Sequence, residues 1–172
     1  MKRAIATLIL SVGLTSTMVP LARSAPGGCG RILYAARSPR GEAIFSMRSD
    51  GTRKQRLVPL GDRWRSFESV GWSPTGEHFA YVRLRFRGEL SRYRLHIARA
   101  DGSGRRVVDV QTDHEPIFSW APGGNRLVYD RPLGEGTFRY KIFIYSLRSG
   151  RSRPLGEEGE HPTWSPDGRF IA

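Results

Sequence analysis

The sequence predicts an all-β fold, a β-propeller made of four-stranded antiparallel blades. Two repeated turn markers are the basis of this prediction. A Trp-(Ser/Ala)-Pro-x-Gly motif occurs three times, with its tryptophans 48 and 44 residues apart. A second marker, a dipeptide ending in glycine, keeps step with the motif at Asp50-Gly51, Asp101-Gly102 and Ser149-Gly150. Two markers in phase at this period are typical of propeller blades.

The first residues have the layout of an export signal. The basic pair Lys2-Arg3 precedes an apolar run over residues 4–19, and the small residues Ala22 and Ser24 stand where signal peptidase requires them. A membrane anchor is the alternative interpretation. The run is shorter and more polar than the ~20 apolar residues of a spanning helix, which favours cleavage after Ser24.

The expected organisation has three parts: a signal peptide at residues 1–24, a short linker at residues 25–30, and a partial propeller at residues 31–172, with no membrane span after signal removal. At ~45 residues a blade, the last part corresponds to about three and a third blades, whereas closed propellers have about four to eight. The sequence also stops within an expected second strand, at Ala172. These observations predict a truncated chain.

In each motif, the tryptophan ends the first strand of a unit and the following residues turn into the second strand. Serine bonds back at the first turn position, proline fixes φ at the second, and glycine closes the fourth. The motif residues are Trp72, Pro74 and Gly76, then Trp120, Pro122 and Gly124, then Trp164, Pro166 and Gly168. We expect these tryptophans to pack between neighbouring sheets, because a repeat core needs the same residue each time. Ligand stacking is the alternative role.

The remaining strands follow from composition. Residues 79–82, 127–129 and 170–172 are aromatic or aliphatic, as second strands should be. Residues 43–46, 95–98 and 142–145 are the expected third strands. The glycine dipeptides then form hairpin turns, since glycine tolerates positive φ, and lead to fourth strands such as residues 106–110.

The run Trp-Ser-Pro-Asp-Gly-Arg-Phe-Ile-Ala at residues 164–172 resembles the repeat of the TolB-type propellers, which are related in shape to WD-type repeats. The resemblance extends from Arg31 onward, although Ala121 and Gly123 depart from the motif in the middle unit. It implies an exported, non-catalytic propeller that binds another protein in the cell envelope.

Charge and cysteine content narrow the function further. The chain carries a formal net charge of +12, but its 25 arginines are spread along the sequence and no nucleic-acid-binding motif is present. We therefore predict no nucleic-acid partner. Cys29 is the only cysteine, which leaves no internal disulfide. Lipidation of Cys29 and an ordinary free thiol both remain open.

No catalytic residue, metal site or cofactor is predicted. The sequence contains no Gly-x-Ser-x-Gly, Cys-x-x-Cys or His-Glu-x-x-His spacing. The candidate binding residues lie in the connections that lead into two Trp-bearing strands, at His114, Glu115, Glu160 and His161. If such loops meet at one mouth of the central channel, they form a site for a basic peptide or a divalent cation. Ordinary solvated loops are the alternative.

The leading functional hypothesis is an exported propeller, periplasmic or extracellular, that binds an envelope or extracellular protein without catalysing a reaction. Two alternatives stay open. The chain can be the N-terminal propeller portion of a prolyl-oligopeptidase-like peptidase, whose hydrolase domain would lie beyond Ala172. It can also be part of a carbohydrate-active propeller in which channel histidines hold a metal.

Overall fold

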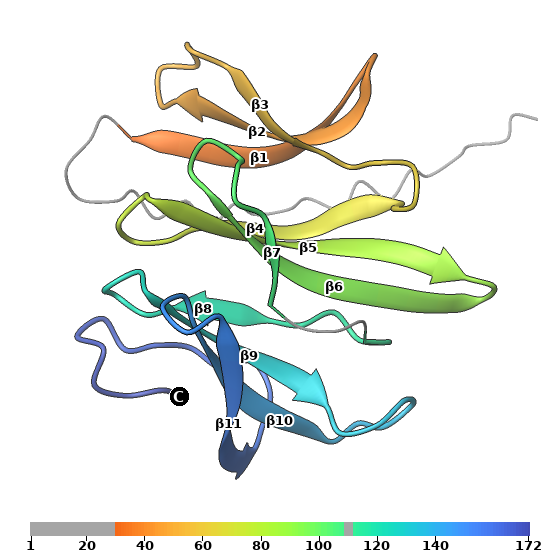
Figure 1. Ribbon diagram of the computed structural model, residues 1–172, viewed down its shortest axis with the longest axis vertical. Helices are drawn as coiled ribbons and strands as arrows, with labels where there is room; N and C mark the ends of the chain where they lie inside the picture. Colours follow the sequence, from red (N-terminus) through yellow and green to blue (C-terminus); the bar gives the residue numbers. More distant parts are fainter. Residues whose placement is uncertain (1–29, 109–111) are drawn as a thin grey trace, which may run out of the picture.

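The computed structural model describes residues 30–108 and 112–172, and it places them in three antiparallel β-sheets (Figure 1). These two ranges contain strands and turns and no helix, so the all-β prediction is confirmed. The predicted signal peptide, Cys29, most of the linker and part of one fourth strand lie outside the described residues. In the described ranges, no helix has the length and apolarity to cross a membrane.

Sheet A contains three strands. They are β1 (Arg31–Ser38), β2 (Gly41–Arg48) and β3 (Gln55–Pro59), hydrogen-bonded in that order. The turn from β2 to β3 holds the Asp50-Gly51 marker. Gly51 takes a φ of 80°, and the Asp50 carboxylate accepts the backbone N–H of Thr52 at 2.8 Å. The glycine supplies the left-handed conformation and the aspartate closes the turn.

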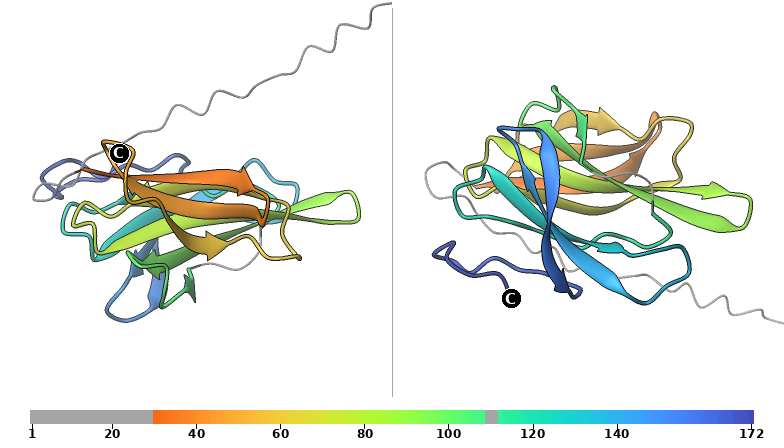
Figure 2. Two further views of the ribbon diagram at one scale, coloured as in Figure 1. Left: turned by 90° about the horizontal axis from the view of Figure 1, so that it is seen from above. Right: turned by 60° about the horizontal axis from the view of Figure 1, so that its bottom comes forward.

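Sheet B contains four strands in sequence order. They are β4 (Ser66–Trp72), β5 (His78–Arg87), β6 (Leu90–Arg99) and β7 (Arg106–Val107). The hairpin of β5 and β6 is longer than the sequence predicts, and it projects beyond the other strands (Figures 1 and 2). The outer half of this hairpin contains arginines and aromatic residues and lacks the apolar pattern of the inner half. The strands predicted from that pattern, 79–82 and 95–98, are therefore shorter than β5 and β6.

Sheet C also contains four strands. They are β8 (Phe118–Trp120), β9 (Arg126–Pro132), β10 (Tyr140–Ser146) and β11 (Arg151–Glu158), again in sequence order. A further hairpin begins after β11, where Trp164 and Ile171 form an antiparallel bridge. Sheets B and C are therefore the four-stranded antiparallel units that the repeat predicts. The number of blades in a closed ring stays a prediction.

The motif turns recur with the same hydrogen bonds. The N–H of Gly76 donates to Ser73 O at 2.9 Å, that of Gly124 to Ala121 O at 2.8 Å, and that of Gly168 to Ser165 O at 2.9 Å. Successive turns also touch each other. A Cβ added at Gly124, whose φ is 68°, would lie 2.7 Å from Thr75 Oγ1 in the preceding turn. Glycine there serves both the turn and the close approach of two blades.

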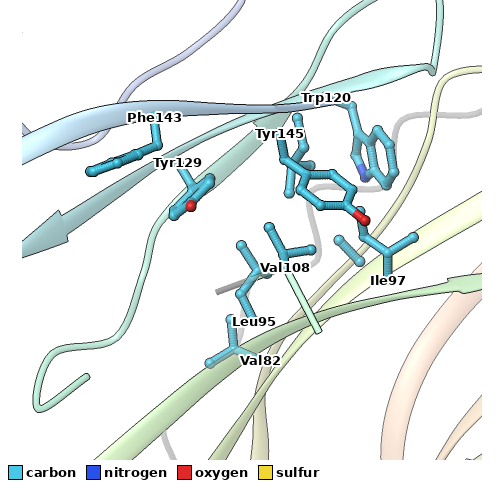
Figure 3. Close-up of a cluster of buried hydrophobic side chains, with 10 residues drawn as sticks. Val82, Leu95, Ile97, Val108, Trp120, Tyr129, Phe143 and Tyr145 are labelled. Carbon is cyan, nitrogen blue, oxygen red and sulfur yellow. The ribbon is translucent and has the colours of Figure 1, made fainter. Parts of the chain in front are cut away.

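The hydrophobic core lies between the sheets, with sheet B in the middle. Trp120 packs with residues of sheets B and C, among them Ile97, Val108 and Tyr145 (Figure 3). Trp72 packs at the equivalent place between sheets A and B, and Trp164 packs against the other face of sheet C. The Trp120 indole N–H also donates to Gly71 O on β4 at 3.3 Å. Each tryptophan thus contacts a different layer of the core.

Candidate binding site at the loop end of the sheets

The candidate site lies where the third strands of sheets B and C begin. Thr112 forms a bridge with Tyr93 near the start of β6, and the N–H of Gly159 donates to Tyr140 O at the start of β10. Both connections that carry the predicted binding residues therefore reach this end of the sheets. We call it the loop end.

Asp130 ties these two connections to β9. Its side chain is fully buried, and its Oδ1 accepts the backbone N–H of Ile117 at 2.8 Å. Its Oδ2 accepts the backbone N–H of His161 at 2.9 Å. One carboxylate therefore holds the segment before β8 and the segment after β11 in place, and charge-assisted bonds of this kind are stronger than neutral ones.

Glu115 is a half-buried carboxylate next to sheet B. Its Oε1 accepts the Ser69 hydroxyl, so a side chain of sheet C's entry loop is anchored to β4. Burial raises the pKa of Glu115, and the negative charges of Glu68 and Asp130 raise it further. The Ser69 hydrogen bond and nearby His114 act in the opposite direction. The net rise means that the folded chain opposes the negative charge of Glu115 when no cation is bound.

His114 and Tyr140 form the neighbouring pair. Their ring centroids are 4.6 Å apart, and the Tyr140 hydroxyl lies 3.4 Å from His114 Nδ1. His114 Nε2 is buried and has no hydrogen-bond partner among the described residues. Burial raises the pKa of the Tyr140 hydroxyl, as do the charges of Glu160, Asp130 and Asp113. We define the acidic group as Glu68, Glu115, Asp130 and Glu160, whose charges act on Glu115 or on Tyr140, the ring partner of His114.

The four predicted residues have different places. His114 lies against Tyr140, and Glu115 lies against Ser69. Glu160 acts on Tyr140 through its charge, and its own side chain is exposed. His161 contributes its backbone N–H to Asp130, while its side chain is exposed and its φ is 55°. In residues 30–108 and 112–172, no group of three His, Cys, Asp or Glu residues has the geometry to hold a metal.

Sequence reasoning missed Asp130, Tyr140, Ser69 and Glu68. Asp130 directly follows the apolar run at 127–129, and the strand predicted from that run ends three residues before β9 does. The side chain of Asp130 is buried, and buried polar side chains have hydrogen-bond partners. Ser69 and Glu68 carry no comparable signal, because they belong to a first strand recognised only by its tryptophan.

The chain was compared with known proteins. It is 34% identical over 79 residues to the Tol-Pal system protein TolB of Alcanivorax borkumensis, which covers 42% of this chain and 18% of that protein. No family model matches the chain. The chain thus spans about a fifth of the length of this curated relative.

Solved structures show the same fold. TolB from Acinetobacter baumannii superposes with a TM-score of 0.60 at 18% identity, over 86% of this chain and 36% of that one. A prolyl endopeptidase structure superposes with a TM-score of 0.62 at 14% identity, over 87% of this chain and 25% of that one. At these identities the likeness concerns the fold, and the propeller architecture is common to both neighbours.

Proposed function

We propose that this chain, which carries the TolB-type β-propeller repeat, is part of an exported and non-catalytic propeller that binds a protein partner in the cell envelope. Its place of action is the periplasm or the cell exterior. The sequence similarity to a Tol-Pal system protein supports this proposal, and so does the absence of a catalytic motif from the printed sequence. The partner contacts the loop end through a basic side chain.

The partly buried position of the Glu115 carboxylate, held against β4 by Ser69, is the observation that carries this proposal, and its raised pKa agrees with it. A half-buried carboxylate beside other acids is electrostatically unfavourable until a cation approaches. An arginine or lysine of a partner supplies that cation, and its attraction to Glu115 is stronger at a partly desolvated site than between exposed charges in water. The acidic group is a local concentration of negative charge in a chain whose net charge is +12. It therefore favours basic partner segments, unlike the rest of the chain.

The test is capture of a partner from envelope extract by the full-length protein. The double variant Glu115→Gln and Glu160→Gln removes two charges and keeps the side-chain shapes. We expect it to retain its fold and to capture the partner at least about tenfold more weakly, since charge-assisted contacts contribute about 1.5–3 kcal/mol. The matched control is Glu77→Gln with Glu89→Gln, because both of these acids are exposed and lie in the turns on either side of β5, outside the acidic group.

Equal capture by both double variants would overturn the role of the acidic group. Loss of capture in both would point instead to a general charge effect. In either case circular dichroism of the variants shows whether the fold is intact, which separates binding from folding.

A second candidate function follows from the likeness to a prolyl endopeptidase. In this alternative the propeller controls access to a hydrolase domain carried by another part of the same protein. Reading the gene beyond codon 172 tests it, because a Ser, Asp and His set with a nucleophile elbow would favour the peptidase over the envelope-binding protein. The carbohydrate-active alternative receives no support from the described residues, which hold no metal-binding group.

A further inference from the structure

A second polar group lies on the opposite face of sheet B, around Trp64. Trp64 belongs to the connection between β3 and β4 and is half-buried. The guanidinium carbons of Arg83, Arg85 and Arg94 lie 5.6, 5.8 and 5.8 Å from its ring centre. We call these four residues the arginine cluster. Each distance is within the range of a cation–π contact, so three positive charges converge on one indole.

Two arginines of the cluster, Arg83 and Arg94, have donors without acceptors. Arg83 Nε and Arg94 Nε are both buried and have no hydrogen-bond partner. One Arg83 terminal nitrogen donates to Pro59 O at 3.1 Å, which satisfies part of that guanidinium. Ion pairs among the described residues join Arg92 to Glu135 and Arg139 to Glu158, and no described carboxylate pairs with Arg83 or Arg94. Buried charged donors left in this way are costly unless an anion is supplied.

His96 shows how positive this region is. Its ring stacks on Tyr81 with centroids 5.0 Å apart and meets Trp64 edge-on at 5.9 Å. The pKa of His96 is lowered to about 3, mainly by burial and also by the positive charges of Arg83 and Arg94. The chain therefore keeps His96 neutral beside the arginines. Burial and the charge of Arg105 also lower the pKa of Arg83.

We infer that the arginine cluster is a binding site for a carboxylate of an acidic protein segment. A carboxylate matches the planar guanidinium fork and provides the acceptors that Arg83 Nε and Arg94 Nε lack. The arginine cluster is also at the loop end. Arg83 on β5 pairs with Phe67 on β4 and with Arg94 on β6. Arg94 is next to Tyr93, which forms the bridge to Thr112. This inference deepens the proposed function: the partner's surface presents a basic side chain to the acidic group and an acidic one to Trp64.

The test uses the full chain and a short glutamate-rich peptide as the probe. Trp64 is one of four tryptophans, so the fluorescence change on titration is assigned by comparing the protein with its Trp64→Phe variant. We expect a saturable change that Trp64→Phe removes. Arg94→Gln should weaken peptide binding about tenfold, the usual effect of losing a charge-assisted hydrogen bond. Arg87→Gln is the matched control, because Arg87 is an exposed arginine of the same hairpin.

Several outcomes overturn this inference. One is equal weakening by Arg94→Gln and Arg87→Gln, and another is a fluorescence change that survives in Trp64→Phe. Inorganic phosphate and phosphatidylglycerol vesicles form two further arms. If either binds in an Arg94-dependent way while the peptide does not, the site takes an oxyanion from another source and the acidic-protein assignment is wrong. Glu115→Gln should leave peptide binding unchanged, so failure here is distinct from failure of the acidic group.

Discussion

The two faces of sheet B differ in how their buried charged groups are hydrogen-bonded. On the face toward sheet C, Ala80 and Val82 of β5 enter an apolar core, and the nearby acids accept hydrogen bonds from the chain itself. On the face toward sheet A, the alternate residues Tyr81 and Arg83 lead into the arginine cluster, where Arg83 Nε and Arg94 Nε have no acceptor among the described residues. The difference is clearest for Asp130, whose two carboxylate oxygens are both bonded within the chain, and for Arg83 Nε and Arg94 Nε, which have no acceptor among the described residues.

Removal of Asp130 should have the largest effect on this comparison. Asp130→Ala leaves the buried N–H groups of Ile117 and His161 without their acceptor, and we expect the free energy of unfolding to fall by about 3 kcal/mol. Urea denaturation measures it. Arg94→Gln, which removes a charge that no described carboxylate pairs with, should cost much less. Equal losses for the two variants would remove the contrast between the faces.

The second effect concerns acid stability and depends on His96. Its pKa in the folded chain is about 3, below the ordinary value of 6.5, so between these pH values the unfolded chain binds more protons than the folded one. Stability from this group is therefore present above pH 6.5 and falls by about 1.4 kcal/mol for each pH unit as the pH drops toward 3.

His96→Phe keeps an aromatic ring against Tyr81 and cannot take up a proton. We expect the loss of stability between pH 7 and pH 5 to be smaller in this variant than in the native chain, by about 2 kcal/mol. Thermal unfolding at the two pH values gives the comparison. Parallel curves for both proteins would mean that His96 is already accessible to protons.

The smallest effect is expected for Glu115→Gln. Because the pKa of Glu115 is raised, the folded chain holds its proton more tightly than the unfolded chain does, and the stability linked to that proton is lost as the pH rises above 4.5. Glutamine has no charge to desolvate and still accepts the Ser69 hydroxyl. At pH 7 the variant should be as stable as the native chain or more stable by less than about 1 kcal/mol. A marked loss would contradict the electrostatic account of the site.

Much of the fold could be predicted from the repeat. The in-phase Trp-Ser-Pro and Asp-Gly markers predicted the TolB-type propeller repeat, and the comparisons with known proteins confirm it. Those markers define turns and one core position in each unit, which explains why the strand order of sheets B and C followed correctly. Strand length did not follow, because the outer half of the β5–β6 hairpin is arginine-rich and lacks an apolar pattern.

The sites were less accessible to sequence reasoning. His114 and Glu115 were found because they lie just before a repeated strand, but their partners Ser69 and Tyr140 come from other strands and their proximity depends on the stacking of two sheets. Trp64 lies outside the repeated motif, and its arginine neighbours are separated from it by about 20 to 30 positions along the chain. Contacts of that range are set by packing, which no local pattern encodes.

The most direct test of the central claim is a calorimetric titration of the full-length protein with a short arginine-rich peptide. If the acidic group recognises a basic segment, the native protein and the Glu77→Gln, Glu89→Gln control bind with the same affinity. The Glu115→Gln, Glu160→Gln variant then binds about tenfold more weakly, as expected for loss of charge-assisted contacts. Equal affinity for all three proteins would contradict the assignment of the loop end as the partner-binding site.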